Sequence, residues 1–271
     1  MVELTQRDQE VHFKDICLTS EQIVTKEITI ADLLQCIKQG AADFGARPFG
    51  SIPFIALFYF LAAAAITLAA FGLELSYFAF PIVAGFTLVG PIVAIGFFQI
   101  SRRRETGQDL KWSAAFEFIH TSAFAPVLAL SIVMTVLYIG WLFTAELIYF
   151  SLFEDSPPAS LRDFIGQLFT TRHGGALIAY GNFVGFLFAI AALSLSVVAF
   201  PLVLDKPVTS LTAMSVSIRA VTSNMLVMVV WGILVTALLL VGALFFLIGL
   251  AVTLPVLGHA TWHLYRKLVE H

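Results

Sequence analysis

The chain has 271 residues, of which 59% are hydrophobic and only 12% are charged, and its formal net charge is −3. Soluble domains are about 45–50% apolar and about 25% charged, so this composition excludes a water-soluble domain, as does the mean hydropathy of +0.92. The small net charge offers no case for nucleic-acid binding, which requires a basic stripe. The composition therefore predicts an integral membrane protein.

Residues 1–28 carry charges of both signs and lack the apolar core of a signal peptide. They predict a cytoplasmic tail that is poorly ordered unless a partner holds it. Cys17 and Cys36 both precede the first apolar run. Two cysteines in this position predict reduced thiols rather than a disulfide framework.

Residues 30–45 have the spacing of an amphipathic helix, with a possible capping box between Thr29 and Asp32. Residues 110–122 and 211–222 repeat this spacing. The three apolar stripes are Ile30, Leu33, Leu34, Ile37, Ala41 and Phe44; Leu110, Trp112, Phe116 and Ile119; and Leu211, Met214, Ile218 and Val221. Because each segment precedes an apolar run, all three are expected to be helices lying at the cytoplasmic membrane interface.

Apolar runs long enough to cross a bilayer occupy residues 52–71, 78–99, 123–150 and 176–201. The outer loop 151–174 is expected to contain a short helix from residue 161 to 169. Residues 225–257 have no charge, and one helix of this length would measure about 50 Å. A bilayer core of about 30 Å cannot hold such a helix upright. We therefore expect two helices joined near residues 241–243, the second extending through Tyr265.

The resulting fold class is all-α, a polytopic membrane protein with six transmembrane helices and both termini in the cytoplasm. Under this topology only Arg162 and Arg172, among the 15 lysines and arginines, lie outside, as the positive-inside rule favours. Residues 29–271 then form the membrane domain. It reads as three parallel hairpin-like units at about 29–107, 108–207 and 208–268, each preceded by an interfacial amphipathic helix.

Several stretches resemble a bacterial inner-membrane family catalogued as domain of unknown function 2189. The resemblance spans about residues 29–268 and is most specific at residues 254–263. It is carried by Asp32-Leu33-Leu34, Asp43-Phe44, Arg47-Pro48, residues 80–86, Gly90-Pro91, Ser101-Arg102-Arg103, Trp112 and residues 254–263. It implies localisation in the bacterial inner membrane and supplies no mechanism.

Three groups of residues are candidate sites. His259 and His263 lie four apart on one helix face, and His120 is expected at the same membrane level; they are weak metal or haem ligands. An interfacial belt with Trp262 and Tyr265 explains them better, so no metal or cofactor is predicted.

Arg102, Arg103, Arg104 and Lys111 are weak candidates for binding lipid headgroups, and a plain topology anchor explains them better. Gly181, Gly185 and Ala189 form a stripe of small residues suited to close helix packing. That packing would occur within the chain or in a dimer.

No catalytic motif is recognisable, so the chain is predicted not to be an enzyme. The leading hypothesis is an accessory subunit or assembly factor that associates with itself or with another membrane protein. The alternative is a passage or binding protein for a lipid or small neutral solute. It requires a cavity lined by Thr87, Ser131, Thr135, Asn182, Ser194, Ser196 and Thr236. A haem- or metal-binding membrane protein is third.

Overall fold

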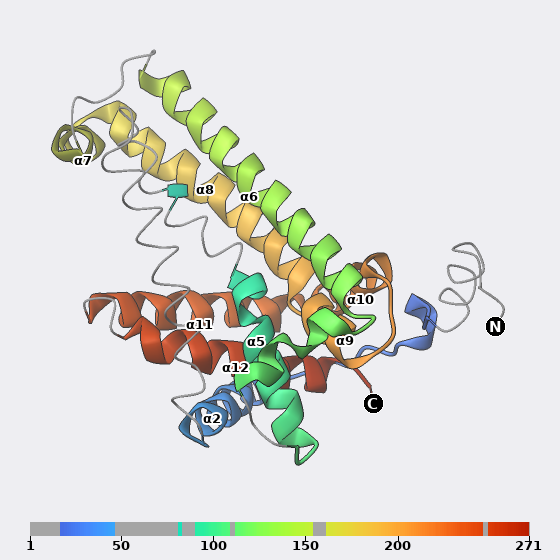
Figure 1. The fold of residues 1–271 in the computed structure, drawn as a ribbon. Coiled ribbons are helices and arrows are strands. Elements are labelled where there is room, and N and C mark those ends of the chain that lie inside the picture. The colour runs from blue at the N-terminus through green and yellow to red at the C-terminus, as the bar shows by residue number, and fades with distance from the viewer. Residues whose placement is uncertain are drawn as a thin grey trace. The chain divides into compact units, whose positions relative to one another are not determined.

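The computed structural model describes residues 17–46, 81–82, 90–108, 112–153, 161–245 and 249–270. Over these residues the regular structure is helical, apart from one isolated bridge between Thr25 and Val269 (Figure 1). The elements are η1 (Ser20–Gln22), α2 (Ile30–Ala46), α5 (Gly90–Glu105), η5 (Trp112–His120), α6 (Phe124–Phe153), α7 (Leu161–Thr170), α8 (Arg172–Ser196), α9 (Ala199–Asp205), α10 (Ser210–Ser223), α11 (Met225–Leu244) and α12 (Leu250–Leu268). The predicted all-α class is confirmed.

The chain divides into two compact units. The first comprises Met1–Ser51, Ala94–Leu130 and Ser194–His271, and the second comprises Ile52–Val93 and Ser131–Leu193. In the second unit, Trp141 of α6 packs with Ala192 of α8 and donates a hydrogen bond to the carbonyl oxygen of Pro81 (2.9 Å). Tyr149 and Phe164 form a smaller cluster that holds the short helix α7. This helix was predicted in the outer loop.

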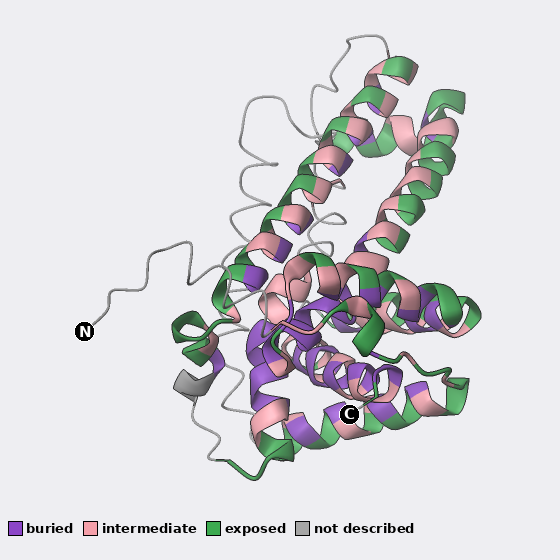
Figure 2. Cartoon of the chain, turned by 90° about the vertical axis from the view of Figure 1, so that its right-hand side faces the viewer, coloured by how far each residue is buried: buried purple, intermediate pink, exposed green. Residues whose placement is uncertain are grey.

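In the first unit, α12 is the central element, and Trp262, Leu264, Tyr265 and Leu268 are each 0% exposed. Figure 2 shows the buried residues gathered around this C-terminal part of the chain. Two glycines allow neighbouring helices to approach α12 closely. A Cβ added at Gly40 of α2 would lie 2.5 Å from the carbonyl oxygen of Val256, and one added at Gly258 would lie 2.5 Å from the Phe97 ring of α5.

Residues 17–28 pack against the end of the chain, which differs from the poorly ordered tail that the sequence suggested. Lys26 N–H donates to the carbonyl oxygen of Leu268 (2.8 Å), and Glu270 N–H donates to that of Val24 (3.0 Å). The Asn224 side chain bonds to the backbone of both Lys26 and Ile28. These partners are distant in the sequence, so a local reading of charge and hydropathy does not reveal them.

The three segments predicted as amphipathic helices are helical over their described residues, although η5 is a 3-10 helix. The buried faces agree with the expected stripes only in part, at Leu33 of α2 and Val221 of α10. On α2 the buried residues are Leu33, Cys36, Gly40 and Asp43, and on α10 they are Ala213, Val216, Ser217, Ala220 and Val221. Of the expected apolar stripes, Ile30 and Leu34 are 54% and 52% exposed, and Leu211 and Ile218 are 74% and 41% exposed. Small residues face the protein here because they let helices approach closely.

Among the described residues, three helices are long and apolar enough to cross a membrane: Phe124–Phe153, Arg172–Asp205 and Met225–Leu244. They correspond to the predicted third, fourth and fifth spans. The predicted span 52–71 lies outside the described residues, and 78–99 is described only in part. α12, the expected sixth span, does not qualify on the same measure.

The predicted division of residues 225–257 into two helices is present, and α11 and α12 lie side by side (Figure 1). The chain turns after Leu244, not at residues 241–243. Gly242 is instead helical and touches the start of α12, because a Cβ there would lie 2.5 Å from Thr253 Oγ1.

Candidate functional site

The first unit contains a buried carboxylate, that of Asp43, which is 7% exposed at the crossing of α2, α5 and α12. It accepts hydrogen bonds from Ser101 Oγ (2.5 Å), Arg104 Nη1 (2.5 Å) and His263 Nε2 (2.9 Å). His259 is 1% exposed, and its Nδ1 lies 2.8 Å from Ser101 Oγ. We call these five residues the Asp43 cluster.

The order of groups in the Asp43 cluster argues against nucleophilic catalysis. In a Ser-His-Asp triad the histidine lies between the serine and the carboxylate and removes the serine proton. Here the serine lies in the middle. Its single proton goes to Asp43, a carboxylate that can only accept, so Nδ1–H of His259 donates to Ser101. Ser101 itself is 1% exposed, although it lines an open pocket of about 310 Å³ together with Asp43 and His263.

The electrostatics of the Asp43 cluster favour a structural role. Burial alone raises the pKa of Asp43, but hydrogen bonds from His263 and Ser101, with the charges of His263 and His259, outweigh burial, so the pKa is lowered. Asp43 is therefore ionised at neutral pH and has three donors. A buried carboxylate satisfied in this way fixes the elements that supply the donors, here α2, α5 and α12.

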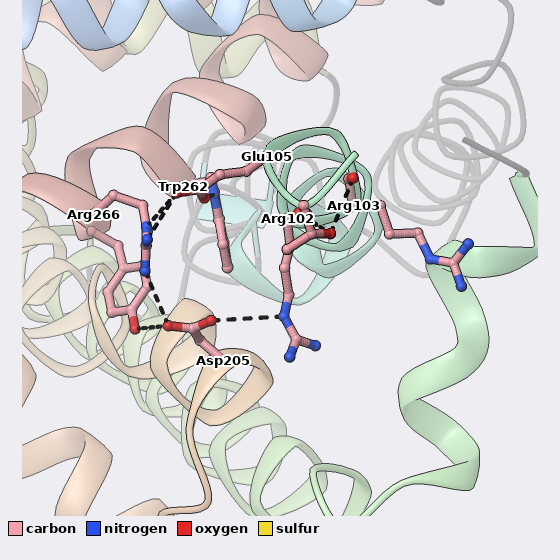
Figure 3. Close-up of polar contacts among 8 residues, drawn as sticks. Arg102, Arg103, Glu105, Asp205, Trp262 and Arg266 are labelled. Atoms are coloured by element: carbon pink, nitrogen blue, oxygen red, sulfur yellow. Dashed lines mark hydrogen bonds and ion pairs between the residues drawn. The ribbon is translucent and has the colours of Figure 1, made fainter. Parts of the chain in front are cut away.

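A second polar cluster joins α5, α9 and α12 (Figure 3). Asp205 at the end of α9 accepts from Tyr265 Oη (2.7 Å) and Arg266 Nη1 (3.4 Å), and Arg102 Nε lies 3.7 Å from it. Glu105 accepts from Trp262 Nε1 (3.1 Å) and Arg266 Nε (2.9 Å). Arg266 thus bridges two carboxylates from two different helices.

A third contact ties the beginning of α2 to the end of α12. Lys267 Nζ donates to Asp32 Oδ1 (2.8 Å) and to Gln35 Oε1 (2.9 Å). The hydrogen bond from Lys267, followed by those from Thr29, lowers the pKa of Asp32 to about 2. The predicted capping box is present, since Thr29 N–H donates to Asp32 Oδ2 (2.8 Å). The same carboxylate group therefore caps α2 and anchors α12.

The histidines singled out as weak metal ligands do not come together as three. His259 and His263 share the Asp43 cluster, whereas His120 lies exposed at the end of η5. Across the described part of the chain, no group of three His, Cys, Asp or Glu side chains is arranged to hold a metal ion. Instead, His263 is hydrogen-bonded to Asp43, and His259 is hydrogen-bonded to Ser101.

The arginines singled out for lipid headgroups each contact a different carboxylate. Arg102 lies near Asp205, Arg103 pairs with Glu117 of η5, and Arg104 pairs with Asp43. Lys111 lies outside the described residues. The arginine run thus connects α5 to three separate elements, and binding of headgroups stays a prediction.

Only one member of the small-residue stripe packs within the described chain. A Cβ at Gly185 would lie 3.1 Å from the Trp141 ring, whereas a Cβ at Gly181 has nothing within 4 Å, and Ala189 is exposed. Asn182, next to Gly181, donates to the carbonyl oxygen of Ile178 on its own helix (2.7 Å).

Sequence reasoning did not identify Asp43, Ser101, Glu105 or Asp205 as site residues. For Asp43 a signal existed. It falls in phase with Leu33, Cys36 and Gly40 on one face of α2, and a charged residue on a packed face needs partners.

The described residues are helical and include three helices long and apolar enough to cross a membrane, which defines this chain as an integral membrane protein. Residues 79–205 match the family DUF2189, described as a predicted integral membrane protein. The resemblance is confirmed over these residues, and the stretch 254–263 lies outside the match. No match was found among the curated proteins or the solved structures.

Proposed function

We propose that this protein is a non-enzymatic, six-span protein of the bacterial inner membrane that acts by lateral association with itself or another membrane protein. It would serve as an accessory subunit or assembly factor. The observation that carries this proposal is that two of the three small residues of the α8 stripe do not pack closely against the described chain. A Cβ added at Gly181 would have nothing within 4 Å in the described chain, and Ala189 is exposed; small residues on a span permit another helix to approach.

The polar groups of the first unit agree with a role without catalysis. Asp43, Glu105 and Asp205 are all engaged with donors from other helices. Catalysis requires titratable or nucleophilic groups that can reach a substrate. The paired groups have a different effect, which is to hold α2, α5, α9 and α12 together.

The same contacts support a topology in which Glu105, Asp205 and Arg266 lie on one side of the membrane, which we propose to be the cytoplasmic side with both termini. Two long helices, α6 and α8, separate Glu105 from Asp205, and two more, α11 and α12, separate Asp205 from Arg266. These three residues contact one another through Arg266. Because these residues lie together, the chain between Glu105 and Asp205, and again between Asp205 and Arg266, is expected to cross the membrane an even number of times. Six spans meet this requirement.

The alternative, a passage for a lipid or small neutral solute, gains no support from the deep hydroxyl groups. Thr135 donates to the carbonyl oxygen of Ser131, and Thr236 donates to that of Gly232, each on its own helix. Hydroxyls satisfied in this way need no polar cavity in order to sit in an apolar span.

Association can be tested with bulky substitutions on α8. Gly181→Ile and Ala189→Ile should reduce the larger species recovered in mild detergent, as measured by native mass spectrometry. The matched control is Gly175→Ile on the same helix, an exposed position where a Cβ also has nothing within 4 Å. Recovery of a monomer from native membranes, or assemblies that tolerate both substitutions, would refute the proposal.

A further inference from the structure

A partly enclosed cavity of about 150 Å³ lies in the first unit, between α5, η5 and the end of α9. Its lining is Gln99, Arg102, Arg103, Thr106, Gln108, Glu117, Phe118, Thr121 and Leu204. The cavity is separate from the Asp43 cluster, since it contains none of those five residues. Pockets that bind drug-sized ligands have volumes of about 300–1,000 Å³, so this smaller cavity suits a single small group.

The charge of the lining favours an anion. Two arginines and one glutamate line the cavity. The glutamate, Glu117, is paired with Arg103, which leaves Arg102 as the source of net positive charge. Arg102 lies near Asp205 only through Nε, at 3.7 Å, and Asp205 also accepts from Tyr265 and Arg266. Figure 3 shows the two terminal nitrogens of Arg102 pointing away from that carboxylate.

The most informative residue is Gln99. It lies on α5 with 7% exposure and lines the cavity. None of the described hydrogen bonds involves its carboxamide, and this group is not among the fully buried atoms that lack a partner. The carboxamide therefore opens onto the cavity, where it can bond to a molecule that enters. An oxyanion in the cavity would accept from the NH₂ of Gln99 and from the guanidinium of Arg102, whereas the hydroxyl of Thr106 donates to the backbone carbonyl oxygens of α5.

We propose that this cavity binds a phosphate group, with Arg102 and Gln99 as its principal ligands. Arginine suits phosphate because its planar fork of N–H groups matches phosphate oxygens in pairs. The phosphate belongs to a lipid headgroup or to a soluble phosphate, and the experiment below separates these sources. The site does not depend on association with a partner protein, so it stands or falls independently of the proposed function.

The test is isothermal titration of the purified chain in maltoside micelles with dihexanoyl phosphatidic acid, dihexanoylglycerol and inorganic phosphate. The phosphatidic acid should bind and the phosphate-free dihexanoylglycerol should not. If phosphate competes only at far higher concentration, the source is a lipid. If the two bind equally, the source is soluble phosphate. Binding of dihexanoylglycerol as tight as that of phosphatidic acid, or binding of neither phosphate compound, overturns the proposal.

Four variants connect binding to this cavity. Arg102→Gln should weaken it about tenfold or more, the effect of losing a charge-assisted hydrogen bond. Arg102→Lys keeps the charge and should retain part of the affinity. Gln99→Leu keeps both net charge and approximate volume, so a loss there cannot arise from general electrostatics. It also decides the matter if Arg102→Gln fails to fold. The control Arg162→Gln on α7 removes an equal charge outside the cavity and should bind phosphatidic acid like the wild type. Unchanged binding by Gln99→Leu, or a loss of affinity in Arg162→Gln as large as in Arg102→Gln, refutes the site.

Discussion

The contact between α2 and α12 can be tested with one substitution made at two positions of the same helix. Gly40 and Gly45 both lie in α2, within Ile30–Ala46. A Cβ added at Gly45 has nothing within 4 Å, whereas one added at Gly40 would meet backbone atoms of Val256 and Ala260. Alanine at either position therefore changes helix propensity in the same direction and differs only in what the new methyl group touches.

The size of the effect at Gly40 follows from three distances. The added Cβ would lie 2.5 Å from the Val256 oxygen, 2.6 Å from the Ala260 nitrogen and 2.9 Å from the Ala260 Cα. Ordinary carbon contacts are about 3.5–4.0 Å, and these atoms are backbone, so α2 must shift away from α12. Overpacking of this kind costs about 1–3 kcal/mol. Asp43 lies one turn further along α2, so the shift also lengthens its hydrogen bonds.

The assay is thermal unfolding in maltoside micelles, followed by the fluorescence of the tryptophans, among which Trp262 is buried on α12. Gly40→Ala should unfold well below the wild type. Gly45→Ala should match it or exceed it by up to about 1 kcal/mol, the gain in helix propensity. Equal stability of the two variants would show that α2 and α12 do not cross as closely as described.

Three further predictions concern charge, topology and ligands. Asp43→Asn should lower the free energy of unfolding at pH 7 by roughly 3 kcal/mol. The wild type should lose stability in acid, and Asp43→Asn should lack this loss. A carboxyl whose pKa is lowered by folding stabilises the fold at pH values above its unfolded pKa of about 3.9, and this stabilisation is lost as the pH falls through the folded pKa. Equal acid sensitivity of the two proteins would contradict this. Reporter fusions at residues 155 and 271 should report opposite sides of the membrane, and the same side would exclude six spans. The purified protein should contain no stoichiometric haem or metal, as absorption and elemental analysis can show; a metal lost on replacing both His259 and His263 would disprove this.

The long apolar helices could be predicted because crossing a bilayer is a bulk property of a segment. Length and hydropathy were enough to place α6, α8 and α11 and to divide residues 225–257 into two helices. The position of the turn was not predictable in the same way. Gly242 looks like a turn residue, but in the structure it supplies space for Thr253.

The polar clusters depend on pairs that no local pattern can identify. Asp43 and His263 are 220 positions apart, and Glu105 and Arg266 are 161 apart. Reading each residue with its sequence neighbours made the histidines an interfacial belt and the arginines an anchor. Their partners become visible only when α12 is placed beside α2, α5 and α9.

The buried faces of α2 and α10 are shifted from the predicted apolar stripes for a common physical reason. A hydrophobic stripe predicts the buried face when the other face meets water, since burial of large apolar side chains drives folding there. Next to a bilayer this reasoning fails, because lipid chains are as apolar as leucine and offer no reason to bury a leucine against protein. Packing between helices then favours residues that permit close approach. Gly40 is such a residue on α2, and Ala213 and Ala220, each 0% exposed, are such residues on α10. The large residues Leu34 and Leu211 are left outside, where our proposal of interfacial helices would have them meet lipid.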